Sequence, residues 1–223
     1  PTQGKETNYY YTGMETIGSP GTARLAITVG AVDHDDGLTQ FSSKGPSGGT
    51  FGVKPDIVAP GDGILSLAPG GGTASKSGTS MASPMVAGVA ALLKSGNKNL
   101  TPAEIKSALM GSSVHLGLSV MKQGAGRVDA MRAMRTTTFS AQAQLSFGLD
   151  DPAQSTFMRS ETLMVFNANA ISQTYSLTAS GAGPGVSLSA SPAVFSVSSG
   201  GTQEVVVTLA VNNGGVPIVE DDI

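Results

Sequence analysis

The 223 residues are enough for one large or two small domains, and a hydrophobic content of 39% against 13% charged residues predicts a substantial core. The net charge of −3 argues against a basic surface for nucleic acid or anionic membranes. The absence of cysteine excludes disulfides and a thiol nucleophile, and no run of eighteen apolar residues predicts a membrane span.

The first part of the chain is predicted to be a loop that leads into a strand. Residues 1–24 are polar, begin with Pro1 in place of Met, and close with the turn signal Gly18-Ser19-Pro20-Gly21. From this start we expect a piece of a longer protein. Residues 25–32 form an apolar run rich in β-branched residues, which predicts a buried parallel strand. The acidic turn that follows lacks the ligand spacing of a calcium loop, so we expect no metal at Asp33, Asp35 and Asp36.

Small residues precede an apolar helix-forming stretch in the middle of the chain. Gly78, Thr79 and Ser80 come directly before a run that extends to Leu93, so we predict a buried helix with Ser80 near its N-terminus. The unpaired N–H groups and the dipole of a helix N-terminus stabilise a negative oxygen. An acyl-transfer nucleophile needs that environment, and Gly78 leaves room for a substrate carbonyl.

This stretch resembles the nucleophile segment of the subtilisin-like serine proteases (subtilases), in the run Gly78-Thr79-Ser80-Met81-Ala82-Ser83-Pro84 with Val86-Ala87-Gly88 after it. Two further blocks match the family in the same order, Phe41-Ser42-Ser43-Lys44-Gly45-Pro46 and Lys54-Pro55-Asp56-Ile57-Val58-Ala59-Pro60-Gly61. The resemblance implies an α/β fold, Ser80 as the nucleophile, and Gly78 and Thr79 in its loop. It also implies that Gly18 belongs to the substrate pocket. Met85 stands where the family has a non-catalytic His.

A partial match to the nucleophile elbow of α/β-hydrolases, Gly78-x-Ser80-x-Ala82, is excluded by chain order. That fold requires the serine, an acid and a histidine in this order along the chain. The only histidine after Ser80 is His115, and it precedes Asp129, the first acid at a plausible distance.

The resemblance implies that the residues that would activate Ser80 are not in this chain. Subtilases place the histidine roughly 150 residues before the serine, whereas 79 residues precede Ser80. His34 lies in the acidic turn and His115 follows the helices, so we expect both on or near the surface. Asn8 lacks the Ala-Gly-Asn-x-Gly neighbours of the family's oxyanion asparagine. The resemblance therefore implies that the base, its aspartate and this asparagine lie upstream, and that the chain alone is inactive.

Two more helix starts follow. Thr101, Pro102 and Glu104 give the pattern of a capping box with proline at the first helical position. Residues 124–131 resemble the start of the last helix of the subtilase domain, and we expect its apolar side chains to pack inward, namely Val128, Met131 and Met134.

The composition changes near Arg135, where the helix signals stop. Short β-forming runs then follow at roughly ten-residue spacing and predict an antiparallel β-sandwich. They fall at residues 139–147, 162–166, 174–178, 186–188, 194–197 and 204–211. We predict an α/β parallel-sheet domain over residues 1–135, a sandwich that resembles fibronectin-III-like domains over 136–215, and an acidic tail or truncated linker over 216–223.

The expected function is that of the Ser-bearing part of a secreted or cell-surface subtilisin-like endopeptidase, which hydrolyses peptide bonds by Ser-His-Asp acyl transfer. Its expected partners are a polypeptide substrate and the missing N-terminal part of the same protease. No cofactor is expected, although many family members bind structural calcium. The alternative is a non-catalytic binding or structural module whose parent lost its triad. Asp-x-Gly and His-Gly-Thr blocks upstream of Pro1 would distinguish the two.

Overall fold

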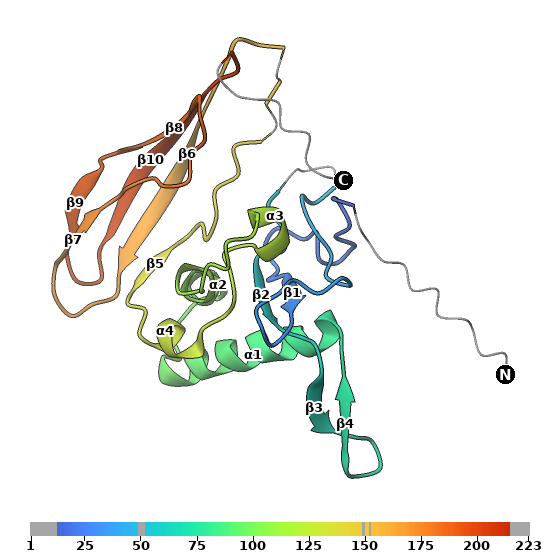
Figure 1. The fold of residues 1–223 in the computed structure, drawn as a ribbon. Helices are drawn as coiled ribbons and strands as arrows, with labels where there is room; N and C mark the ends of the chain where they lie inside the picture. Colours follow the sequence, from blue (N-terminus) through green and yellow to red (C-terminus); the bar gives the residue numbers. More distant parts are fainter. Residues whose placement is uncertain (1–12, 49–51, 149, 152, 215–223) are drawn as a thin grey trace.

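The computed structural model describes residues 13–48, 52–148, 150–151 and 153–214. Short strands come first in the described part of the chain, helices follow up to Met134, and only strands come after them (Figure 1). Asn8 and the predicted acidic tail over residues 216–223 lie outside the described residues.

Two parallel strands form the centre of the first part. β1 (Val29–Val32) pairs with β2 (Ile57–Pro60) in parallel register, and most of their residues are buried. The predicted strand over residues 25–32 is right only for its second half. Leu25 is 79% exposed, and the backbone N–H of Thr28 donates to the Asp56 carboxylate instead of to a neighbouring strand. The Thr28 carbonyl still accepts from the Asp56 N–H at 2.8 Å, but its own N–H is bound by a side chain, and the regular strand begins at Val29.

An antiparallel hairpin follows β2 and projects away from the body of the molecule (Figure 1). It consists of β3 (Ile64–Leu67) and β4 (Thr73–Lys76). Leu65 and Leu67 lie on one face of β3 and are 68% and 86% exposed. The hairpin was not predicted, because its strands are short and its loop of three glycines gives only a turn signal.

Helices follow the hairpin in the chain. They are α1 (Thr79–Gly96), α2 (Pro102–Gly111), α3 (Val120–Gln123) and α4 (Ala130–Met134). α1 packs on both β1 and β2, and its inward side chains join the main core, namely Ala82, Val86, Val89 and Leu93. The predicted helix with Ser80 near its N-terminus is confirmed, as is the capping box of Thr101 and Glu104.

The expected packing of the last helix is wrong for its methionines. Val128 is 9% exposed, but Met131 and Met134 are 61% and 43% exposed. α4 has only five residues, and Ala133 is the fully buried one. The small alanine allows the helix to lie close to its neighbours, which turns both methionine side chains toward solvent.

The six predicted runs after Arg135 all contain strands. β5 (Thr138–Ser140), β6 (Thr156–Asn167), β10 (Thr202–Asn212) and β8 (Val186–Ser191) form an antiparallel sheet in that order. β7 (Gln173–Ser176) and β9 (Val194–Val197) form a second antiparallel pair. The run over residues 139–147 is a strand only at its start.

Two hydrophobic clusters make up the interior. The smaller one lies between the β7–β9 pair and the larger sheet, and it is formed by Val165, Phe195, Val197 and Val205. The larger one includes Phe139 of β5, which packs with the helices and stacks on Phe166 of β6 at 6.3 Å between ring centroids. The four-stranded sheet is thereby joined to the core of the first part.

Candidate active site

The predicted nucleophile lies at an exposed helix start. Ser80 is the second residue of α1 and is exposed to solvent. Gly78 is the N-cap, with φ of 153° and without a side chain to bond the first turn. That φ favours glycine, because a side chain would strain this backbone. The start of α1 is therefore free of side-chain caps.

The loop before α1 is fixed to the end of β2 by close backbone packing. The Gly78 N–H donates to the carbonyl of Gly61 at 2.7 Å, and the Gly61 N–H donates to the carbonyl of Val32 at 2.9 Å. A Cβ on Gly61 would lie 2.7 Å from the Cβ of Ala31 and 2.8 Å from the carbonyl oxygen of Gly78. Only glycine allows this approach, which places Ser80 beyond the carboxyl ends of β1 and β2.

The backbone beside Ser80 can bind a negative oxygen. The Met81 N–H donates to the Gly78 carbonyl at 2.9 Å, whereas the N–H groups of Thr79 and Ser80 have no acceptor within the described ranges. These two donors point out of the first turn, where the helix dipole adds partial positive charge. The site can therefore stabilise the oxyanion that forms when a hydroxyl attacks a carbonyl.

A cavity of about 150 Å³ reaches from Thr79 to the predicted pocket residue Gly18. No charged side chain lines it; the lining residues are Ile17, Gly18, Gly21, Thr28, Val29, Gly30, Ser43, Pro55 and Thr79. The structure thus brings two of the predicted site residues, Gly18 and Thr79, to one cavity. Its surface suits an uncharged side chain.

Neither histidine contacts Ser80 in the described part of the chain. His34 is 86% exposed and lies 3.3 Å from the carboxylate of Asp35. The Nδ1 atom of His115 accepts from the Gly117 N–H at 3.0 Å, and its Nε2 atom lies 3.1 Å from the Gln123 amide nitrogen. Their polar contacts in the described part of the chain lie within eight residues of each ring, and the described site has no base for the Ser80 hydroxyl.

The acidic turn after β1 is held by its own backbone and by an arginine. Asp33 Oδ1 accepts from the N–H groups of Asp35 and Gly37 at 2.9 and 2.8 Å. Asp36 pairs with Arg127 at 2.6 Å. Within the residues that the structure describes, no group of three or more His, Cys, Asp or Glu side chains is arranged to hold a metal.

Three residues that build this site were not singled out from the sequence. Gly61 positions the nucleophile loop, and Thr28 and Pro55 line the cavity. Gly61 and Pro55 lie within the family-like block over residues 54–61, so the sequence showed the block but not that these two residues build the site. Thr28 lies inside an apolar run and gave no separate signal.

The chain belongs to the subtilase family: residues 7–148 match the family described as Peptidase S8, Subtilase family. It is 37% identical over 153 residues to membrane-bound transcription factor site-1 protease of Mus musculus, a match that covers 64% of this chain and 14% of that protein. It is 40% identical over 123 residues to alkaline elastase YaB of Bacillus sp. (strain YaB), covering 55% of this chain and 30% of that protein. Minor extracellular protease Vpr of Bacillus subtilis (strain 168) is 34% identical over 164 residues, covering 68% of this chain and 20% of that protein.

The chain therefore spans less than a third of the length of each of these three relatives. Among the described residues, none of the helices combines the length and apolar character that crossing a membrane requires.

Proposed function

We propose that this chain is the Ser-bearing part of a subtilisin-like serine endopeptidase. The observation that carries the proposal is the position of Ser80, exposed at the start of α1 beside two free N–H groups and next to an uncharged cavity. Ser80 Oγ attacks the substrate carbonyl, and the N–H of Ser80 stabilises the oxyanion. The side chain before the scissile bond enters the cavity lined by Gly18 and Thr79.

The base and its aspartate come from an upstream region of the same protease. The outer surface of α1 supports this proposal, because Leu92 is 53% exposed and the small residues Ala87, Gly88 and Ala91 are exposed beside it. A parallel strand pair normally lies in a sheet covered on both faces. The upstream region would cover this surface and bring a histidine to the Ser80 hydroxyl.

Two further features belong to the proposal. Residues 136–215 form a fibronectin-III-like sandwich that follows the catalytic domain; the antiparallel strands and their shared cluster support it. The protease acts outside the cell or on its surface. One relative, the Vpr protease of Bacillus subtilis, carries "extracellular" in its name.

A fluorophosphonate probe, which labels activated serines, tests the proposal. The 223-residue chain alone should remain unlabelled, because a serine without a base is a poor nucleophile at neutral pH. The chain expressed together with its upstream region should be labelled and should cleave casein. Ser80→Ala should abolish both signals, whereas Ser95→Ala, on the same helix, should retain them. Rapid labelling of the isolated chain would contradict the missing base, and labelling that survives Ser80→Ala would contradict the assigned nucleophile.

A further inference from the structure

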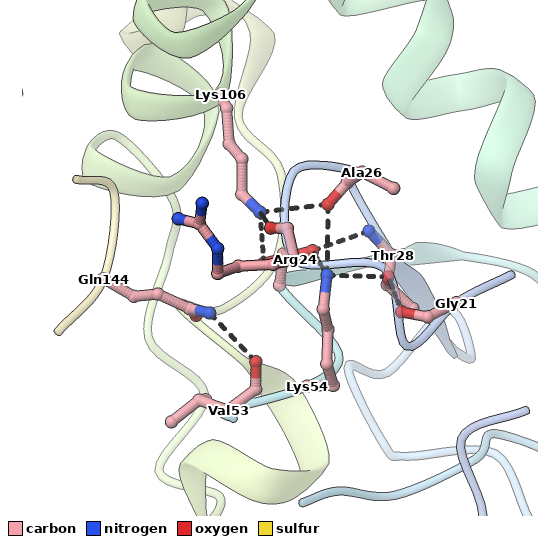
Figure 2. Close-up of polar contacts among 9 residues, drawn as sticks. Gly21, Arg24, Ala26, Thr28, Val53, Lys54, Lys106 and Gln144 are labelled. Carbon is pink, nitrogen blue, oxygen red and sulfur yellow. Dashed lines mark hydrogen bonds and ion pairs between the residues drawn. The ribbon is translucent and has the colours of Figure 1, made fainter. Parts of the chain in front are cut away.

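A buried cluster of charges lies at the amino-terminal ends of β1 and β2. Lys54 and Asp56 come just before β2, and Lys106 reaches them from α2; Figure 2 shows the two lysine side chains converging on the loop that precedes β1. The Lys54 and Lys106 side chains are 3% and 11% exposed, and that of Asp56 is fully buried. Two ammonium groups thus share one carboxylate inside the protein.

Each oxygen of the Asp56 carboxylate has its own ammonium partner. Lys54 Nζ donates to Oδ2 at 2.6 Å, and Lys106 Nζ lies 2.7 Å from Oδ1. Oδ2 also accepts from the Thr28 N–H at 2.7 Å. The carboxylate therefore holds both lysines in place and anchors the end of the loop.

The same two ammonium groups bind carbonyls of that loop. Lys106 Nζ donates to the carbonyls of Arg24 and Ala26 at 3.2 and 3.0 Å (Figure 2). Lys54 Nζ donates to the carbonyl of Ala26 at 3.1 Å. Loop residues 23–26 are exposed and contribute nothing to the main core, so these bonds are what attaches the loop to α2 and β2.

A chain of hydrogen bonds connects the cluster to the cavity. Lys54 Nζ donates to Thr28 Oγ1 at 3.0 Å, and this hydroxyl donates to the carbonyl of Gly21 at 2.6 Å (Figure 2). Gly21 and Thr28 both line the cavity, and so does Pro55, between the two charged residues of the β2 segment. Three of the lining residues are therefore held by groups in or next to the cluster.

Burying these three charged groups costs free energy, whereas apolar side chains would fill the same space without that cost. Burial lowers the pKa of Lys106, and the nearby charges of Lys54 and Arg24 lower it further, against the opposing attraction of Asp56. Buried ion pairs often contribute little net stability compared with apolar residues of the same volume. Charged donors instead fix the positions of the carbonyls that they bind.

We propose that the Lys54, Asp56 and Lys106 cluster positions loop 21–28 as one wall of the substrate pocket and so controls selectivity for the substrate side chain that enters it. The inference rests on the proposed function of this cavity. All three are positioning residues: Lys54 and Asp56 reach the pocket through Thr28, and Lys106 holds the Arg24 and Ala26 carbonyls of the same loop.

The test uses Lys106→Met, which removes two carbonyl contacts and the ion pair with Asp56 Oδ1 but leaves Asp56 Oδ2 paired with Lys54. Lys106→Arg keeps the charge and the donors, and Lys98→Met removes an exposed lysine elsewhere. Hydrogen exchange of the 223-residue chain should accelerate about ten-fold at the bonded amides of loop 21–28 in Lys106→Met, the effect of losing hydrogen bonds to a charged group. Exchange in β10 should not change. Lys106→Arg should restore the wild-type rate, and Lys98→Met should match the wild type.

The second readout is selectivity in the chain expressed with its upstream region. After active-site titration, kcat/KM is compared for peptides with leucine or alanine before the scissile bond. A loosened wall should reduce the leucine-to-alanine ratio about ten-fold in Lys106→Met. A merely structural role would lower the amount of active enzyme and leave this ratio unchanged, and an unchanged ratio overturns the proposal.

The two proposals fail in different ways. If the wild-type assembly does not cleave peptides, the proposed function is wrong, while the exchange data still decide whether the cluster holds the loop. If Lys106→Met does not fold, Thr28→Val removes the hydroxyl link to Gly21 at nearly constant volume. Exchange at the amides of loop 21–28 that stays at the wild-type rate in the folded variant overturns the positioning role.

Discussion

At the scale of single residues, Gly61 has the least room for change. Alanine at this position would bring its Cβ to 2.7 Å from Ala31 and 2.8 Å from the Gly78 carbonyl oxygen. Both neighbours are fixed, one in β1 and one in the nucleophile loop. We expect Gly61→Ala to lower the free energy of unfolding of the 223-residue chain by about 1–3 kcal/mol, the usual cost of overpacking. Urea denaturation measures this change.

Gly88→Ala is the matched control for Gly61→Ala. Gly88 lies inside α1, and nothing lies within 4 Å of the position of its missing Cβ. Alanine has a higher helix propensity than glycine by about 1 kcal/mol, so this variant should be as stable as the wild type or more so. Equal effects of the two substitutions would contradict the close approach described at Gly61.

The pKa of Lys106 gives a prediction about pH. Burial lowers this pKa below the ordinary lysine value of 10.5, so the unfolded chain binds the proton more tightly than the folded chain does. Between the lowered pKa and the ordinary value, the unfolded state carries more protons, and the stability contributed by this group rises with pH. The wild type should therefore gain stability relative to Lys106→Met as the pH rises through the range just below 10.5. Urea titrations at several pH values measure the difference in free energy of unfolding between the two proteins. A difference that falls as the pH rises over this range would contradict the prediction.

At the scale of elements, α2 depends on its N-terminal cap. Thr101 Oγ1 accepts from the Glu104 N–H at 3.3 Å, and the Glu104 carboxylate accepts from the Thr101 N–H at 2.7 Å. Thr101→Ala should cost about 1 kcal/mol of stability, because the Glu104 N–H in the first turn loses its side-chain acceptor. Chemical denaturation gives the free energy of unfolding of Thr101→Ala and of Ser95→Ala, an exposed control substitution. The difference between the two variants measures the contribution of the cap. No difference between the two would show that the cap contributes nothing.

At the scale of the whole molecule, Phe139 links the helices to the four-stranded sheet. It is 5% exposed, belongs to the main core and stacks on Phe166. Phe139→Ala should lower stability by about 3–5 kcal/mol. Because the side chain contacts both parts, hydrogen exchange should accelerate in α2 and in β6 together.

Met158→Ala provides the comparison for Phe139→Ala, because Met158 lies in β6 and is 72% exposed. It should change neither stability nor exchange. Faster exchange in β6 alone after Phe139→Ala would show that the two parts unfold independently.

The local elements of this chain could be predicted because their signals are local. The start of α1, the cap of α2 and the positions of the later strands follow from spacing, capping residues and β-forming runs. Membership of the subtilase family likewise followed from contiguous blocks of residues, and the match over residues 7–148 confirms it. Each of these properties depends on neighbours within a few positions, which a linear sequence displays directly.

What the sequence by itself determined was therefore the family, the helix that carries Ser80, the capped start of α2 and the change from helices to strands after Arg135. Only the tertiary structure decided that Gly61 fixes the nucleophile loop, that the strand begins at Val29, and that Lys54 and Lys106 meet Asp56 behind the cavity. The physical reason is distance along the chain. Lys106 contacts a carbonyl 82 residues away, and no local pattern encodes such a contact until the fold brings the two segments together.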